Sequence, residues 1–253
     1  MDTVAVLLAA GKGTRMRSDL AKVLHEFAGE PLLVHPLRAA RRFGVSRSIV
    51  VVGHQAEAVE AAVAARLPAS EGWAIEFAVQ AEQLGTGHAV ACALPALGEA
   101  FTGAVLILSG DVPLLSANTL AALAAACERS SAGIALASFR PADPSGYGRL
   151  LRDAEGHVVG IREHKDASAE ERGIAECNAG VYCVLADHLR RELPQLGSAN
   201  AAGEIYLTDL IGVRARAGTV EVVEVDPDEV AGVNTPEQLV DLEQRGRARG
   251  LLA

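Results

Sequence analysis

Short apolar runs alternate with longer amphipathic runs along the first half of the chain. The runs at 4–10, 48–53, 104–111 and 133–140 are almost wholly apolar, as strands buried on both faces of a sheet are. Between them lie segments with the length and spacing of helices that cover such a sheet. The pattern predicts an α/β fold with a Rossmann-like, doubly wound, mixed but mostly parallel sheet.

Further elements follow from local signals. Residues 75–80 alternate apolar and polar side chains and predict another strand. Ser116 stands before an alanine-rich run, where a serine caps a helix by accepting from backbone N–H groups. The predicted helices of this half are 31–43, 56–66, 87–98 and 116–130.

After residue 140 the pattern changes to loops and shorter strands. Strands are expected at 178–185 and 219–225, with a helix near 187–193. No linker, repeat or low-complexity segment interrupts the chain. We therefore expect one domain, 1–253, made of a first half, 1–140, an insertion-rich second half, 141–235, and a C-terminal helical segment, 236–253.

Composition excludes several classes of protein. Half of the 253 residues are hydrophobic and 22% are charged, which is typical of a globular protein with its own core. No apolar run approaches the roughly 18 residues that span a bilayer. The N-terminal run carries Asp2 and ends in Gly-Lys-Gly, unlike a signal peptide. We predict a cytoplasmic protein without a membrane partner.

Charge and cysteines narrow the functions further. The net charge of −9 argues against a nucleic-acid partner. Residues 1–47 nevertheless carry eight Lys and Arg against four acids, so an anionic ligand, if the chain has one, is expected at that end. For Arg38, Arg41 and Arg42 an exposed helix face is favoured over a ligand contact. No pair of cysteines has the C-x-x-C spacing of zinc or redox sites. Buried free thiols are expected at Cys92, Cys127, Cys177 and Cys183.

A glycine-rich turn, LLAAGKGTRM (7–16), follows the first buried strand directly. Gly11 and Gly13 let the backbone approach a ligand and point N–H groups at an anion, and Arg15 can bind phosphate oxygens through two hydrogen bonds. The turn lacks the P-loop pattern, and Met16 breaks the dinucleotide pattern G-x-G-x-x-G. On spacing alone, a phosphate-binding loop and a merely tight connection both stay open.

Asp111 ends the strand-like run AVLILSGD. Ligands of open α/β sheets bind at the carboxyl ends of the strands, where a carboxylate can hold a hard cation such as Mg²⁺. An aspartate at this place can equally cap the following turn. The glycine-rich turn favours the cation.

Nine motifs stand in the order and rough spacing of the sugar-nucleotide pyrophosphorylases, and the chain resembles most the N-terminal uridylyltransferase domains of bacterial bifunctional N-acetylglucosamine-1-phosphate uridylyltransferases. The resemblance covers about residues 4 to 240 and implies a GT-A-like nucleotidyltransferase fold. The motifs are LAAGKGTRM, DLAKVLHEFAG, QAEQLGTGHA, GDVPLL, GYGRL, EHKDA, NAG, GEIYLTDL and GVNTPEQL.

The resemblance implies roles for individual positions. Arg15 and Lys22 match the family's phosphate-contacting cations, and Asp111 and Asn234 match its Mg²⁺ ligands. The positions that match the nucleotide-binding residues are Leu8, Ala9, Ala10, Gly11, Gly13, Gln80, Gly85 and Thr86. Those that match the contacts to the amino sugar and its phosphate are Gly148, Glu163 and Asn178.

For three of these residues a purely structural role is an open alternative to ligand binding. Glu163, next to His164 and Lys165, could form a solvated ion pair, and Asn178 or Asn234 could cap turns. The implied function is Mg²⁺-dependent transfer of UMP from UTP to N-acetylglucosamine 1-phosphate, which yields UDP-N-acetylglucosamine, a cell-wall precursor, and pyrophosphate. The alternatives are transfer with another base or acceptor, such as hexose 1-phosphate or molybdopterin, and a non-catalytic nucleotide-sugar sensor.

The chain departs from the family pattern at three positions. Ala21 replaces the usual proline before Lys22, and Ser109 and Ala179 replace an aromatic and a hydroxyl residue beside the expected sugar pocket. The hexapeptide repeats of a left-handed β-helix, the acetyltransferase half of the bifunctional enzymes, do not occur in these 253 residues. From this we expect a monomer or weak dimer.

Overall fold

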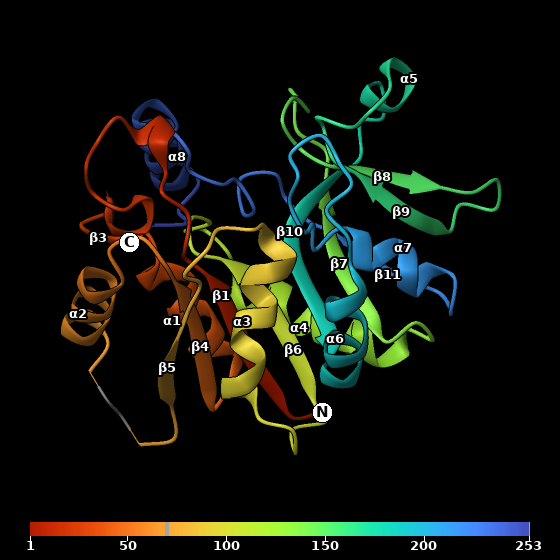
Figure 1. Ribbon diagram of the computed structural model, residues 1–253. Helices are drawn as coiled ribbons and strands as arrows, with labels where there is room; N and C mark the ends of the chain where they lie inside the picture. The colour runs from red at the N-terminus through yellow and green to blue at the C-terminus, as the bar shows by residue number, and fades with distance from the viewer. Residues whose placement is uncertain (69–70, 253) are drawn as a thin grey trace.

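A mixed sheet of nine strands forms the centre of the molecule (Figure 1). A computed structural model describes residues 1–68 and 71–252. Seven strands follow the order β11-β7-β10-β6-β1-β4-β5, and β8 and β9 extend the sheet from β10. The seven are β1 (Thr3–Leu8), β4 (Arg47–Val52), β5 (Ala74–Val79), β6 (Ala104–Ser109), β7 (Ile134–Phe139), β10 (Cys177–Leu185) and β11 (Glu221–Glu224).

Strand direction decides which loops share an edge. β1 pairs in parallel with β4 and β6, β4 with β5, and β11 with β7, whereas β10 runs antiparallel to β6 and β7. In the β1–β6 register Leu8 lies beside Ser109, so the loops after both strands leave the sheet together. The predicted mixed, mostly parallel sheet is confirmed.

Helices cover both faces of the sheet. Ala5 and Leu7 of β1 belong to the core under α1, α2 and α4, whereas Val4 and Val6 belong to the core under α3, α6 and α7. This alternation is the doubly wound arrangement that the apolar runs predict. The helices are α1 (Val34–Phe43), α2 (Ala56–Arg66), α3 (Thr86–Leu97), α4 (Ala117–Arg129), α5 (Ala169–Arg172), α6 (Ala186–Glu192), α7 (Asp209–Ala215) and α8 (Pro236–Ala248).

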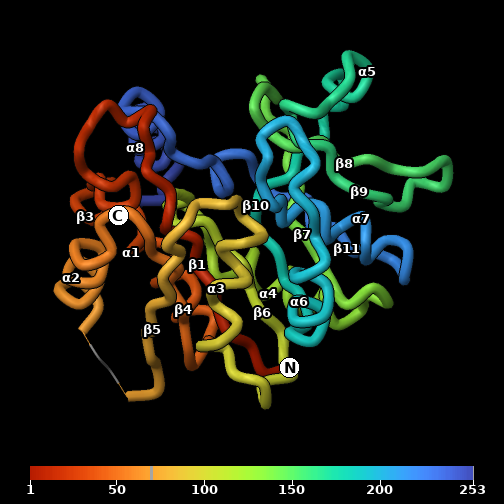
Figure 2. Tube along the Cα trace, in the orientation of Figure 1, coloured from red at the N-terminus to blue at the C-terminus, as the bar shows by residue number. Residues whose placement is uncertain are grey.

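The C-terminal helix α8 lies against the N-terminal loop, as Figures 1 and 2 both show. Met16, Phe27 and Leu242 share a small apolar core, and Arg17 forms an ion pair with Glu237 at 3.4 Å. The packing brings the segment before α8 to the glycine-rich turn. Short elements complete this region and its surroundings: η1 (Thr14–Met16), η2 (Lys22–Leu24), β2 (Glu26–Phe27), β3 (Glu30–Pro31) and η3 (Leu193–Gln195).

The second half adds a hairpin to one side of the sheet. β8 (Arg149–Arg152) and β9 (Val158–Arg162) pair antiparallel, and β8 joins β10 at Cys177. α7 packs on β9. The hairpin and the following α5 project away from the main sheet in Figure 1.

The structure corrects some predicted elements. The helix predicted at 31–43 begins only at Val34, because Pro31 pairs with Glu26 in the small β2–β3 sheet. The strand predicted at 219–225 is shorter, and α7, which the sequence pattern left unassigned, begins at Asp209. Cys92 is half-buried rather than buried.

Other predictions about the whole chain have different outcomes. The other three cysteines are buried and free, as predicted. Among the described helices, none has the length and apolarity to cross a membrane. The single domain over 1–253 and the oligomeric state stay predictions.

The central position of β6 predicts a large effect of core truncation there. Leu106 is fully buried, so Leu106→Ala is expected to lower the free energy of unfolding by about 2 to 5 kcal/mol, measured by urea denaturation. Val79 on the edge strand β5 is 60% exposed, and Val79→Ala is expected to cost under about 1 kcal/mol. A loss at Leu106 no larger than at Val79 would contradict this core.

Candidate functional site

The glycine-rich turn leaves β1 at the edge where the loop after β6 also begins. Gly13 has a φ of 65°, a left-handed conformation that favours glycine, and a Cβ there would collide with the side chain of Lys22. Gly13 thus lets the turn lie directly against Lys22. Around Gly11 nothing lies within 4 Å of where a Cβ would be, so its backbone faces open space.

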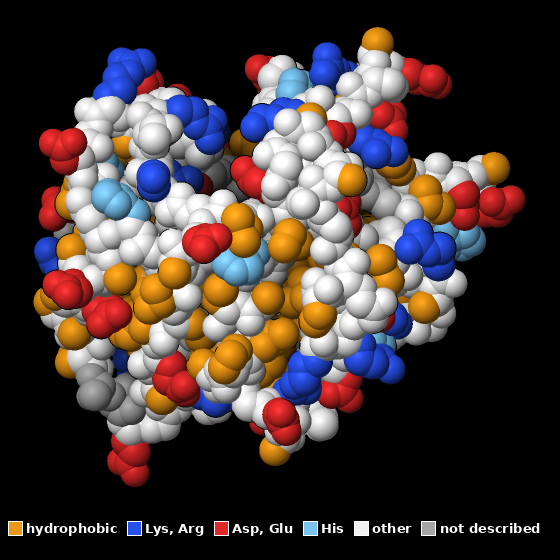
Figure 3. Space-filling model, in the orientation of Figure 1, with side chains coloured by type: hydrophobic (Ala, Val, Ile, Leu, Met, Phe, Trp, Pro, Cys, Tyr) orange, Lys and Arg blue, Asp and Glu red, His pale blue; other side chains and the backbone are white. Residues whose placement is uncertain are grey.

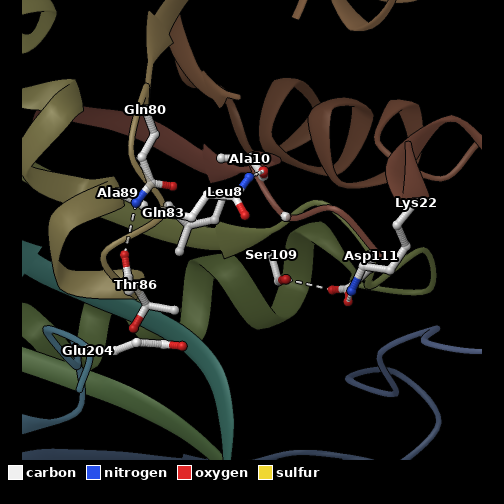
Figure 4. A pocket seen from close by; sticks show the side chains of 12 residues that line it. Leu8, Ala10, Lys22, Gln80, Gln83, Thr86, Ala89, Ser109, Asp111 and Glu204 are labelled. Carbon is white, nitrogen blue, oxygen red and sulfur yellow. Dashed lines mark hydrogen bonds and ion pairs between the residues drawn. The ribbon is translucent and has the colours of Figure 1, made fainter. Parts of the chain in front are cut away.

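A first cavity of about 360 Å³ opens beside this turn (Figure 4). It contains most of the residues predicted to bind nucleotide, but Ala9 and Gly13 are not part of its wall. Ala9 is buried, and its N–H donates to Val51 O, so it ties the end of β1 to β4. The lining residues are Leu8, Ala10, Gly11, Lys22, Gln80, Gln83, Gly85, Thr86, Ala89, Ser109, Asp111 and Glu204.

A second cavity of about 250 Å³ adjoins the first. Its wall includes Gly148, Glu163, Asn178 and Asn234, the residues predicted for the sugar and for one metal contact. Figure 3 shows the surface hollowed between the side that carries α8 and the side that carries α5 and β8. The residues common to both cavities are Leu8, Thr86, Ser109 and Asp111.

Cations and oxygen atoms converge where the two cavities meet. Lys22 Nζ donates to Asp111 Oδ2 and, at 3.1 Å, to Asn234 Oδ1. Arg15 donates to the same Asn234 Oδ1 at 2.9 Å. Arg15, which is exposed, lines neither cavity. The four residues come from three distant segments that the sheet edge and α8 bring together.

Ser109 holds the second oxygen of Asp111, its Oγ donating to Oδ1 at 2.5 Å. With Oδ1 engaged, Oδ2 is directed at Lys22. Sequence reasoning treated Ser109 only as a neighbour of the sugar pocket and did not assign it this contact. A hydroxyl residue two positions before the aspartate was the available signal.

Two further residues of the first cavity were missed. Gln83 donates to Ala10 O at 2.8 Å and ties its loop to the end of β1. Glu204 enters the wall from the distant GEIYLTDL segment. Both placements are tertiary contacts, which a local sequence pattern does not predict.

The loop before α3 and the first turn of that helix are fixed in place by the segment after residue 203. Gly85 has a φ of 110°, and a Cβ there would lie 2.6 Å from Ile205 O. Gly87 N donates to that same carbonyl at 2.8 Å, and Ile205 N donates to Leu84 O at 2.7 Å. These contacts fix the conformation of the backbone beside Thr86, where it lines the cavity.

The second cavity contains a buried carboxylate. Thr208 Oγ1 donates to Glu163 Oε1 at 2.9 Å. Burial raises the pKa of Glu163, which the Thr208 hydrogen bond opposes and the nearby Asp209 and Asp166 charges reinforce. The solvated ion pair considered for Glu163 does not occur, since its hydroxyl partner and its place in the cavity wall take its carboxylate away from Lys165.

Asn178 both caps a turn and lines the cavity. Its Oδ1 accepts from Gly180 N at 3.1 Å, and its Nδ2 donates to the Tyr182 hydroxyl at 2.6 Å. Asn234 accepts from Lys22 and Arg15 through Oδ1, as described above. The turn-capping alternative therefore holds for Asn178 without removing it from the site.

Comparison with known proteins now adds to the geometry. Residues 5–206 match the family described as the MobA-like NTP transferase domain. The chain belongs to this family. It is therefore a nucleotidyltransferase, and the family resemblance inferred from its motifs is confirmed. Asn234 and α8 lie beyond the matched residues.

Its relatives agree with this membership. The chain is 55% identical over 235 residues to the bifunctional protein GlmU of Anaeromyxobacter sp. (strain Fw109-5), covering 93% of this chain and 47% of that protein. It is 51% identical over 239 residues to GlmU of Trichlorobacter lovleyi, covering 94% and 50%. This nucleotidyltransferase chain thus spans about half the length of the curated relatives it matches.

Solved structures confirm the fold. A UDP-glucose pyrophosphorylase complexed with UDP-glucose superposes with a TM-score of 0.79 at 16% identity, covering 98% of this chain and 100% of that one. HddC from Yersinia pseudotuberculosis complexed with GMP-PN gives 0.69 at 20% identity, covering 96% and 98%. The predicted nucleotidyltransferase fold is therefore the observed one.

The raised pKa of Glu163 predicts a pH-dependent stability. Because the folded chain holds this proton more tightly than the unfolded chain, folding loses stability as pH rises through the folded-state pKa. Glu163→Gln removes this loss. The variant is expected to be more stable than the parent at about pH 8, with this advantage lost at about pH 3, below the unfolded-state glutamate pKa of about 4.3, where both states are protonated. Urea denaturation over this range measures it.

Glu171 provides a control of opposite sign. The hydrogen bond from Ser168 N lowers the pKa of Glu171, so its ionised form favours the folded state above the ordinary glutamate pKa. Glu171→Gln is expected to be less stable than the parent at neutral pH, and this deficit disappears on acidification. The same sign of change for both variants would contradict the burial of Glu163.

Proposed function

We propose that this chain transfers UMP from UTP to N-acetylglucosamine 1-phosphate in the presence of Mg²⁺, giving UDP-N-acetylglucosamine and pyrophosphate. The observation that carries the proposal is that two cavities share a wall at Ser109 and Asp111 beside a cluster of cations. Two ligands placed one in each cavity would present their phosphates to the same point. The names of the relatives, bifunctional GlmU, support the same reaction.

The first cavity suits a nucleoside triphosphate. Its wall includes Gln80, which is 4% exposed, together with Gly85 and Thr86. A buried amide that recognises one base is left unpaired by another, which is how hydrogen-bonding sites reject wrong substrates. The Leu8–Gly11 backbone and the Lys22 ammonium face the space that the ribose and phosphates would take.

The second cavity suits an amino-sugar phosphate. Glu163 and Asn178 are polar groups in a wall that also includes the backbone of Gly148. A Cβ on Gly148 would lie 2.9 Å from Ile161, so only glycine leaves the backbone free to lie this close to β9. Carboxylate and amide groups match the hydroxyl and acetamido groups of the proposed acceptor. Ser109 and Ala179, which depart from the family pattern, lie in this wall.

The cluster at the shared wall fits a divalent cation. The Lys22 ammonium bridges Asp111 Oδ2 and Asn234 Oδ1, so two oxygen ligands already surround one positive charge. Within the described residues no three His, Cys, Asp or Glu side chains group as a metal site. Mg²⁺ commonly takes one or two protein oxygens and completes its shell with substrate phosphates and water. Asp111 and Asn234 would hold it, and it would neutralise charge on the reacting phosphates.

The protein's own part in the reaction is positioning and charge neutralisation. An oxygen of the acceptor phosphate attacks the α-phosphorus of UTP, and the bond to the bridging oxygen of the pyrophosphate breaks. Lys22 offsets the negative charge near the reacting phosphates, and Arg15 stabilises the departing pyrophosphate. Because both substrates are held at one point, the translational and rotational entropy of bringing them together is lost on binding and no longer adds to the activation barrier. No side chain forms a covalent bond with either substrate.

Removal of either charge at the shared wall is expected to abolish most turnover. Loss of one such contact costs about 3 kcal/mol in the transition state, or roughly a hundredfold in rate. Lys22→Ala and Asp111→Ala are each expected to show this loss in kcat while circular dichroism shows that each variant is folded at the assay temperature. Arg66→Ala and Asp187→Ala, which remove exposed ion pairs elsewhere, serve as matched controls. Near-parental rates in Lys22→Ala or Asp111→Ala would remove that residue from the proposal.

The substrate assignment is tested by pyrophosphate release. The protein is incubated with Mg²⁺, N-acetylglucosamine 1-phosphate and each of the four nucleoside triphosphates, with EDTA as control. Release with UTP alone, abolished by EDTA, is expected. Release with another nucleotide, or only with another sugar phosphate, would overturn the assignment of base or acceptor. Tight UTP binding without turnover under any combination would favour a nucleotide-sugar sensor.

A further inference from the structure

The buried amide of Gln80 has two acceptors on one side. Its Nε2 donates to Gly85 O at 3.0 Å and lies 3.1 Å from Nδ1 of His88, one turn into α3. His88 lies outside the cavity wall, and no sequence motif assigned it a role of its own. Its contact with the Gln80 amide indicates such a role.

The orientation of the amide follows from what each group can do. A backbone carbonyl only accepts, so the Gln80 atom that faces Gly85 O is the nitrogen. One Nε2 hydrogen is engaged there, and the second points at His88 Nδ1, which must then be the unprotonated ring nitrogen. This assigns the ring proton to Nε2, which lies 3.8 Å from the weak acceptor Cys92 Sγ.

The oxygen of Gln80 is left for a ligand. Figure 4 shows it directed away from Ala89 and towards the side of the cavity where Ala10 lies. Among the residues that the structure describes, none donates a hydrogen bond to this oxygen. At Gln80 the wall of the first cavity therefore presents an acceptor.

We propose that His88 is a positioning residue that fixes the Gln80 amide with its oxygen towards the base and thereby sets the preference for uracil over cytosine. The inference rests on the proposed function, which places the base of UTP at Gln80. Uracil carries a hydrogen on ring nitrogen 3, which an amide oxygen accepts. Cytosine has no hydrogen there and leaves the oxygen of Gln80 facing a second acceptor.

The contribution of His88 is separable from that of Gly85. With Gly85 O alone, turning the amide by half a rotation sacrifices one hydrogen bond. With His88 accepting at Nδ1 it sacrifices two, because both Nε2 hydrogens lose their partners. To recover one of them, the ring proton of His88 must move from Nε2 to Nδ1, and Nε2 then loses its contact with Cys92 Sγ. One neutral hydrogen bond corresponds to about a tenfold change in an equilibrium. His88 therefore sharpens the discrimination between bases by about that factor.

Variants at position 88 test this role. His88→Phe keeps a ring but removes the acceptor, and His88→Leu is a second variant without one. His88→Asn can place its Oδ1 where Nδ1 lies and restore the acceptor. The measurement is kcat/KM for UTP and for CTP at saturating N-acetylglucosamine 1-phosphate and Mg²⁺, with melting temperatures to show that each variant folds.

The expected result is a UTP-to-CTP ratio about tenfold lower in His88→Phe and His88→Leu, and close to the parent in His88→Asn. A purely structural role would lower activity with both nucleotides and leave the ratio unchanged, and that outcome overturns the inference. A ratio lowered equally in His88→Asn also overturns it. A parent protein that does not prefer UTP contradicts the proposed function instead, so the two failures are distinct.

Discussion

The contact between the Lys22 ammonium and the Asp111 carboxylate is the interaction around which the site is arranged. Asp111 is 7% exposed, and a carboxylate that is so buried requires a charged or hydrogen-bonding partner. Lys22 supplies the charge and Ser109 supplies a hydrogen bond. The segment that carries Lys22 therefore meets the end of β6, and Asn234 before α8 joins them through its hydrogen bond with Lys22.

The fold brings the segments that make this contact to one edge of the sheet. The parallel pairing of β1 and β6 places Leu8 beside Ser109, so both following loops begin at the same edge. Helix α8 packs on the N-terminal loop and brings Asn234 to the same place. Two cavities then share a wall at Asp111, and this shared wall is what suits the site to joining two phosphorylated ligands.

Much of the fold could be predicted because burial alone determines it. Strands buried on both faces must be apolar throughout, and β1, β4, β6 and β7 are found within a few residues of the predicted runs. Helix α2 spans the predicted residues 56–66. The start of α1 was wrong because Pro31 pairs with a strand that has only two residues, too few for any periodicity.

The site was predictable only as far as its residues stand in motifs. Asp111, Lys22 and Asn234 converge as the resemblance implies, although the residues that match the family, 5–206, end before Asn234. The hydrogen bond from Ser109 and the placement of His88 behind Gln80 depend on side-chain direction in the folded chain. Such contacts have no sequence period, so they emerge only from the structure.

The central claim is that the two cavities are one site that meets at Asp111. Hydrogen–deuterium exchange with and without UDP-N-acetylglucosamine tests it directly, because that molecule would occupy both cavities at once. Slower exchange is expected both in residues 80–89 and in the segments around Gly148 and Asn178, with little change in α2, which lines neither cavity. Protection of only one of the two cavities would contradict the claim.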